Sequence, residues 1–159
     1  MLLKHQPWNG PEMSCEPIRE FEWNCWKTCQ HPFGQLEVGE SVLTVTGGGP
    51  DAGRIMNDAL VVELVKGHYG SLDEAWAMIE NGFDAEILDE FGITKEVFLD
   101  NAYTRQAPAE GWLLAWWSFP EFIIDQPRPD GLRFRPNGWA ELPDADLHYL
   151  YENATVVED

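Results

Sequence analysis

Four side chains with metal-binding chemistry lie near the start of the chain: Cys15, Cys25, Cys29 and His31. Thiolates and imidazoles in a group of four suit a closed tetrahedral zinc site. Sites of this kind usually contain a Cys-x-x-Cys pair, and the sequence has none. Cys25 also falls in an alternating polar and apolar segment, where a buried free thiol is common. We therefore expect free thiols, with no metal and no other cofactor.

The glycine-rich segment Thr46–Gly53 invites comparison with a phosphate-binding loop. Such a loop ends in Lys-Ser/Thr and leads into a helix. Here Arg54 follows instead and opens an apolar, strand-like run, so a connection between two strands is the better interpretation. Motifs of serine hydrolases, zinc proteases and EF-hands are absent from the sequence. We assign no catalytic residue, and the sequence gives no positive support for an enzyme.

Negative charge is concentrated in one part of the chain. The formal net charge is -18 over 159 residues, and the segment from Ser71 to Asp130 alone has thirteen acidic and three basic residues. Binding long duplex DNA requires clustered Lys and Arg to replace counterions along the phosphates. We therefore exclude that function. A small ligand, a basic protein partner and plain solubility stay open.

The spacing of apolar residues predicts strands early and late in the chain. Residues 20–26 and 41–46 alternate or are β-branched, and residues 54–65 end in a long apolar run. Residues 111–124 predict a buried strand in which Pro120 marks a bulge or a strand end. Weaker patterns predict short strands at Leu132–Arg135 and Leu147–Tyr151.

The middle of the chain predicts helices. Ser71 and Glu74 have the spacing of a capping box, and Asp84 and Thr94 are in position to begin two further short helices. The apolar residues of this segment repeat at helical spacing, so we expect the following side chains to be buried: Trp76, Ile79, Ile87, Leu88, Phe91 and Phe98.

We predict a single α+β domain over residues 1–159, a small and mostly antiparallel β-barrel. Residues 1–19 are expected to form an extended arm, residues 71–102 an acidic helical insert, and residues 152–159 an acidic tail. No apolar leader or membrane-length run occurs, and three cysteines do not make a closed disulfide framework. These features favour a cytoplasmic protein with reduced thiols and no membrane contact; the oligomeric state stays open.

Part of the chain resembles the PUA-like superfamily, in particular its ASCH and EVE branches. Gly39-Glu40 within Leu36–Val45 is similar to the Gly-Asp turn of those proteins, and Ala59–Leu64 is similar to their returning strand. Asn81–Asp84 and the late strand Trp112–Trp117 extend the resemblance, which spans Phe21 to about Phe119. The Gly-x-Lys signature that often opens ASCH domains is absent.

The resemblance implies a barrel with helices at its openings, and recognition of a base, a nucleotide or a modified nucleic acid in an aromatic cleft. On this hypothesis the ligand-binding residues are Trp23, Trp26, Lys27, Arg54 and Trp116.

The competing hypothesis is an acidic inhibitor that mimics DNA, as phage anti-restriction and anti-CRISPR proteins do. It would occupy the site of a basic nucleic-acid-binding protein. Its partner-binding residues would be Asp84, Glu86, Asp89, Glu90, Glu96 and Asp100.

Overall fold

The computed structural model describes residues 1–7, 19–47 and 53–157. These residues form a mixed α+β fold built on one sheet of seven strands. The strands are β1 (Leu2–Pro7), β2 (Glu20–Trp26), β3 (Ser41–Gly47), β4 (Arg54–Tyr69), β5 (Gly111–Pro127), β6 (Trp139–Glu141) and β7 (Thr155–Val156).

The chain divides into two compact units, each described by itself below. The first comprises residues 1–19, 39–61 and 119–159, and the second comprises residues 20–38 and 62–118. Both β4 and β5 contribute residues to each unit.

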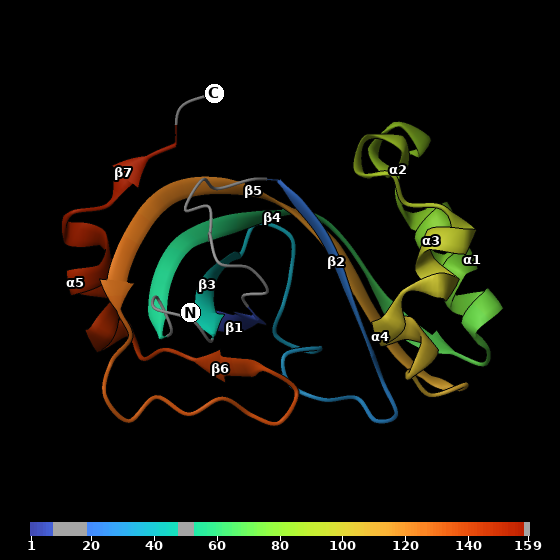
Figure 1. The fold of residues 1–159 in the computed structure, drawn as a ribbon, viewed down its shortest axis with the longest axis horizontal. Helices are drawn as coiled ribbons and strands as arrows, with labels where there is room; N and C mark the ends of the chain where they lie inside the picture. Colours follow the sequence, from blue (N-terminus) through green and yellow to red (C-terminus); the bar gives the residue numbers. More distant parts are fainter. Residues whose placement is uncertain (8–18, 48–52, 158–159) are drawn as a thin grey trace. The chain divides into compact units, whose positions relative to one another are not determined.

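The sheet has the strand order β2-β5-β4-β3-β1-β6, with β7 pairing to β5. The pairs β2–β5, β3–β4, β1–β6 and β5–β7 are antiparallel, and β1 runs parallel to β3. The mostly antiparallel arrangement was expected. In the first unit the strands curl into a half-barrel (Figure 1).

The strand predictions for residues 20–26 and 41–46 are confirmed by β2 and β3, and β4 extends beyond its predicted end. The alternation of polar and apolar residues explains why β2 could be predicted. Its odd-numbered residues all lie on one face of the strand and join the core. Their side chains are Phe21, Trp23 and Cys25.

Four short helices follow β4, and a fifth lies near the C-terminus. Their bounds are α1 (Leu72–Gly82), α2 (Ala85–Phe91), α3 (Lys95–Asp100), α4 (Ala102–Arg105) and α5 (Leu147–Glu152).

The predicted caps of α1 to α3 are largely confirmed. Ser71 Oγ accepts the N–H of Glu74 at 3.1 Å, and Thr94 Oγ1 accepts the N–H of Val97 at 3.2 Å. Asp84 is the N-cap residue of α2, although its side chain makes no capping hydrogen bond. Gly92 ends α2 with φ +66°, a conformation that glycine adopts without strain.

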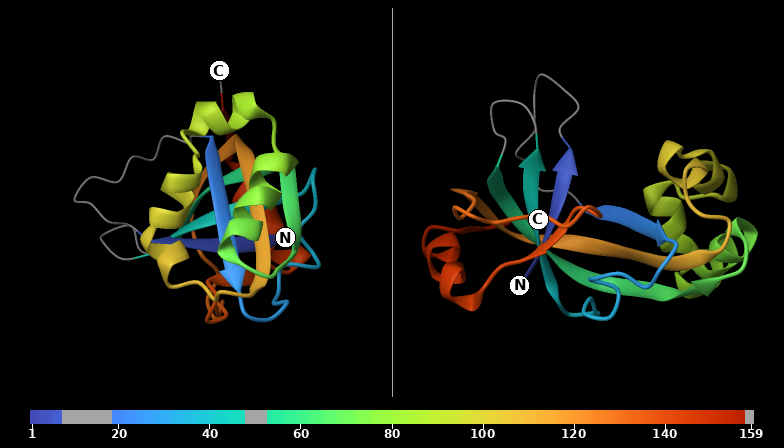
Figure 2. Two further views of the ribbon diagram at one scale, coloured as in Figure 1. Left: turned by 90° about the vertical axis from the view of Figure 1, so that its right-hand side faces the viewer. Right: turned by 90° about the horizontal axis from the view of Figure 1, so that it is seen from below.

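In the second unit, helices α1 to α4 lie on one side of the β2, β5 and β4 segments (Figure 2). Buried residues of the helices and strands make one cluster, which includes Trp76, Ile79, Leu88 and Phe98 as predicted. Two further side chains expected inside, Ile87 and Phe91, are partly buried against it.

The first unit has its own core. Its buried members come from β1, β3, β4, β5, β6 and α5 and from Leu142 just after β6, and η1 (Asp144–Asp146) leads into α5. They are Leu3, Leu43, Val45, Ile55, Ile124, Ala140, Leu142 and Leu150.

Two strand predictions are wrong. Leu147–Tyr151 is helical, because the 3-10 turn at Asp144–Asp146 leads directly into α5 and only Leu150 of this stretch is fully buried. Leu132–Arg135 is not a strand, and its residues lie in irregular structure before the Gly138 turn. Patterns of four or five residues are too short to distinguish strand from helix or loop.

The expected N-terminal arm instead begins as β1, which lies between β3 and β6 in the sheet. Residues 8–18 of that arm, and residues 48–52 of the glycine-rich segment, lie outside the described residues. Strand β5 does not end at Pro120: this proline falls between the stretch paired with β2, which ends at Ser118, and the stretch paired with β7, which begins at Phe122.

Within the described part of the chain, none of the helices has the length and apolar character needed to cross a membrane.

Candidate functional site

Trp23 lies on the helix-facing side of β2. Its indole Nε1–H donates to Thr104 Oγ1 of α4 at 2.9 Å, and its ring centroid is 5.5 Å from that of Phe98. Thr104 is completely buried. Both the ring and the polar edge of Trp23 are therefore used within the second unit.

Trp26 and Trp116 lie on the other face of the same strands, because strand neighbours alternate. Their side chains are 7% and 1% exposed. In the register Trp26 is opposite Trp112, while Trp116 is opposite Glu22, four residues before Trp26 in β2. The sheet therefore does not gather the three predicted tryptophans into one exposed aromatic surface.

The two cationic residues predicted to bind a ligand, Lys27 and Arg54, differ in their surroundings. Lys27 is exposed just after β2. Arg54 lies in the first unit and contacts Asp125, with its Nε 2.8 Å from Oδ1 and its Nη2 2.7 Å from the backbone oxygen. Asp125 has φ +49°, and these two hydrogen bonds hold it in that conformation.

All six predicted partner-binding carboxylates are exposed. On α2, Glu86 lies three and four residues before Asp89 and Glu90, and on α3 Glu96 lies four residues before Asp100. Such spacings place side chains on one helix face. We call Asp84, Glu86, Asp89, Glu90, Glu96 and Asp100 the acidic helix surface.

Few cations compensate this surface. Arg105 Nη2 is 3.5 Å from Asp100, and Lys95 Nζ is 3.2 Å from Asp73 on α1. Within residues 19–47 and 53–157, Asp84, Glu86, Asp89 and Glu96 make no ion pair. Like charges at these spacings repel each other, so buried residues such as Leu88 and Phe98 must hold the helices together.

Of the three cysteines considered as zinc ligands, the structure describes two, and these two differ in exposure. Cys15 lies outside the described residues, Cys25 is buried, and Cys29 is exposed. Burial raises the pKa of the Cys25 thiol to about 11, an effect partly offset by a hydrogen bond with Tyr69. Among the residues that the structure describes, no three His, Cys, Asp or Glu side chains form a metal-binding group.

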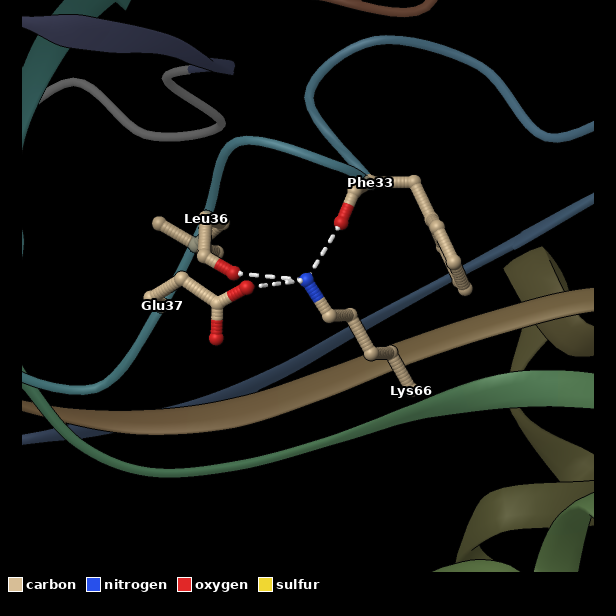
Figure 3. Close-up of polar contacts among 4 residues, drawn as sticks. All are labelled: Phe33, Leu36, Glu37 and Lys66. Atoms are coloured by element: carbon tan, nitrogen blue, oxygen red, sulfur yellow. Dashed lines mark hydrogen bonds and ion pairs between the residues drawn. The ribbon is translucent and has the colours of Figure 1, made fainter.

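Lys66 forms a polar centre that the sequence analysis missed. Its Nζ donates to the backbone oxygens of Phe33 at 2.8 Å and Leu36 at 3.1 Å, and to Glu37 Oε1 at 2.8 Å (Figure 3). Three hydrogen bonds use every donor of the ammonium group. A lysine directly after the apolar Leu64 and Val65 was the available signal, since a half-buried lysine requires partners.

Asp58 is the second missed centre, in the first unit. It is 2% exposed, and its carboxylate accepts the N–H of Phe122 and the hydroxyl of Tyr151. Burial raises the pKa of Asp58, and these two hydrogen bonds offset part of the rise. An acidic residue between the apolar positions Met56 and Ala59 was the signal.

Of these features, the acidic helix surface is the one that groups several exposed charges of the same sign, and it is the candidate functional site. Comparison of the chain with protein-family models, curated proteins and solved structures gives no match.

Proposed function

We propose that this protein binds a basic segment of another protein through the acidic helix surface. The observation that carries the proposal is the exposure of all six carboxylates on the outer sides of α2 and α3 and the turn before them. Carboxylates at this density attract Lys and Arg and accelerate diffusional encounter. A nucleic-acid-binding protein offers such residues, and the carboxylates would stand in for phosphates there.

The energetic balance of the helices supports this proposal. Glu86 with Glu90, and Glu96 with Asp100, are like-charge pairs four residues apart, and each such pair costs a helix about 0.2–0.5 kcal/mol. The cations of a basic partner would offset these repulsions by attracting both members of each pair. These carboxylates would then contribute to binding as well as to solubility.

Base recognition by a PUA-like barrel is the second proposal, and the curled, mostly antiparallel sheet favours it. It requires a ligand to reach tryptophans that are buried or hydrogen-bonded, namely Trp23, Trp26 and Trp116. We rank it below partner binding for that reason.

The proposals are separated by binding assays on two matched variants. The surface variant changes Asp84→Asn, Glu86→Gln, Asp89→Asn and Glu96→Gln. The control variant removes the same charge from exposed positions of the first unit, with Asp130→Asn, Glu141→Gln, Asp144→Asn and Glu152→Gln. The probes are a fluorescent oligolysine peptide and a panel of free nucleosides.

We expect the surface variant to bind oligolysine about tenfold more weakly than the wild type, because several screened charge pairs are lost together. The control variant should lose much less of its affinity for oligolysine. Equal losses of affinity in both variants would show that binding depends only on the net charge of the protein, which would contradict the proposal. Saturable nucleoside binding that survives in the surface variant would support base recognition instead.

A further inference from the structure

Tyr103 on α4 has an enclosed hydroxyl and an open ring. Its hydroxyl oxygen accepts the backbone N–H of Cys25 at 3.1 Å, and the hydroxyl donates to the backbone oxygen of Cys25 at 3.4 Å. Burial raises the pKa of the Tyr103 hydroxyl, an effect partly offset by the hydrogen bond from Cys25. The residue as a whole is nevertheless 44% exposed. The exposed area therefore lies on the rest of the residue, which is chiefly the aromatic ring.

The fold explains why this tyrosine is fixed in place. Strand β2 is at one end of the strand order, so its backbone groups that point away from β5 have no neighbouring strand among the described ones. At Cys25 the hydroxyl of Tyr103 supplies both the acceptor and the donor. Asn101 Oδ1 accepts the N–H of Tyr103 at 2.9 Å, and the next residue, Thr104, is fully buried. The ring is thus oriented before any partner binds.

Tyr103 lies at one end of the acidic helix surface. Asn101 is both the C-cap of α3 and the N-cap of α4, so the second helix begins where the first ends (Figure 1). Tyr103 follows Asp100 by three residues. Their Cα atoms are therefore at most about 11 Å apart. Arg105 Nη2 lies 3.5 Å from Asp100, which shows that a guanidinium fits beside this carboxylate.

The open ring of Tyr103 has no aromatic or cationic neighbour among the described residues. Val97 on α3 is 45% exposed, so two of the four large apolar side chains described as exposed lie on α3 and α4. Open aromatic faces attract cations, and tyrosine is a frequent anchor in protein interfaces. Here such a face lies next to carboxylates that attract the same cations.

We propose that Tyr103 makes the acidic helix surface selective for arginine: a guanidinium of the basic partner stacks on the Tyr103 ring while carboxylates of α3 accept its N–H groups. This inference rests on the proposed partner binding and adds which cation the partner presents. A guanidinium is planar and weakly hydrated, and its donors point outward in its plane, so it can stack and donate at the same time. A lysine ammonium is compact and strongly hydrated, and it gains less from the ring.

The test compares the wild type with Tyr103→Leu and Tyr103→Phe. The probes are fluorescent oligoarginine and oligolysine peptides of equal length, and the readout is the ratio of the oligolysine Kd to the oligoarginine Kd. Tyr103→Leu removes the aromatic face and the hydroxyl but stays apolar. Tyr103→Phe keeps the ring and removes only the hydroxyl, so it controls for the lost hydrogen bonds with Cys25.

We expect the wild type and Tyr103→Phe to prefer oligoarginine to the same degree. In Tyr103→Leu the ratio should fall about two- to fivefold, through weaker binding of oligoarginine, because a stacked cation at an exposed site is lost. An unchanged ratio in Tyr103→Leu would overturn the proposal. An equal fall in Tyr103→Phe would also overturn it, because the ring would then not be the cause.

Failure of this inference can be distinguished from failure of the proposed partner binding. If Tyr103→Leu keeps the wild-type ratio while the surface variant binds both peptides weakly, only the selectivity for arginine is wrong. If the wild type binds neither peptide, both proposals are wrong.

NMR on the wild-type protein gives a second test, which applies even if Tyr103→Leu does not fold. Oligoarginine should shift the ring resonances of Tyr103 and leave those of Tyr149, in the first unit, unchanged. Oligolysine at equal saturation should shift the Tyr103 ring much less. Equal shifts of the Tyr103 ring with both peptides, or no shift with oligoarginine, would contradict the proposal.

Discussion

Tyr151 donates its hydroxyl hydrogen to Oδ2 of Asp58 at 2.9 Å, while Oδ1 of the same carboxylate accepts the backbone N–H of Phe122 at 2.8 Å. One buried carboxylate on β4 thereby joins β5 and α5 within the first unit. The rings of Tyr151 and Phe122 also meet edge-on at 5.8 Å. The C-terminal helix is therefore held by a polar contact as well as by the apolar packing of Leu150.

Replacing this carboxylate tests its structural role. Asp58→Ala leaves the Phe122 N–H and the Tyr151 hydroxyl without their acceptor, so we expect a loss of about 2–4 kcal/mol in the free energy of unfolding. Asp58→Asn keeps one acceptor and gains a donor, and it should cost little. Urea unfolding of both variants measures the difference; similar stabilities for Ala and Asn would contradict the assignment.

The stability of the protein should also depend on the ionisation of Asp58. Burial raises its folded-state pKa above the ordinary value of 3.8. Between the ordinary pKa and the raised pKa, the folded state therefore binds more protons than the unfolded state. The free energy of unfolding contributed by this group therefore falls as pH rises from about 3.8 through the raised pKa.

Asp58→Asn removes this titration, and its difference in stability from the wild type should grow in favour of the variant over the same pH window. Urea unfolding at a series of pH values measures that difference. A difference that does not change with pH would show that Asp58 does not titrate in this way.

The hydrogen bond from Trp23 to Thr104 should be stabilising. Thr104→Val keeps the shape of a fully buried side chain but leaves the indole N–H without an acceptor, so we expect a loss of about 1–3 kcal/mol. Thr104→Ser retains the hydroxyl and is the matched control, although it removes a methyl group. Thermal or urea unfolding should rank serine above valine, and the reverse order would contradict this role.

The cysteines should differ in reactivity. Cys25 is 5% exposed and its thiol pKa is raised to about 11, whereas Cys29 is exposed. Because the thiolate is the reactive form, iodoacetamide at pH 8 should modify Cys29 rapidly and Cys25 only on unfolding. Peptide mapping by mass spectrometry distinguishes the two sites. Rapid labelling of Cys25 in the folded protein would show that its burial is wrong.

Local signals in the sequence predicted the elements whose structure depends on local contacts. Ser71 and Glu74 lie one helical turn apart, so their capping interaction could be read directly, and Thr94 caps α3 for the same reason. The alternation of residues 20–26 likewise predicted β2 with its observed bounds. Such patterns contain both partners within a few residues.

Long-range pairing was not available from the sequence. The strand β1 is defined by parallel pairing of Leu2 with Val42 and of Leu3 with Leu43, and nothing in residues 2–7 indicates those partners. Lys66 and Asp58 were missed as polar centres because their acceptors and donors lie about thirty to ninety residues away. The exposed carboxylates of α2 and α3 were predictable, because helix periodicity places them opposite Leu88 and Phe98.

The association rate of the protein with an oligolysine probe, measured by stopped flow at several salt concentrations, tests the central claim most directly. The proposed steering by the acidic helix surface predicts a rate that falls steeply with salt in the wild type and in the first-unit control variant. The surface variant should associate more slowly at low salt and show a much shallower dependence. Identical salt dependence in the surface and control variants would contradict the claim that α2 and α3 carry the binding surface.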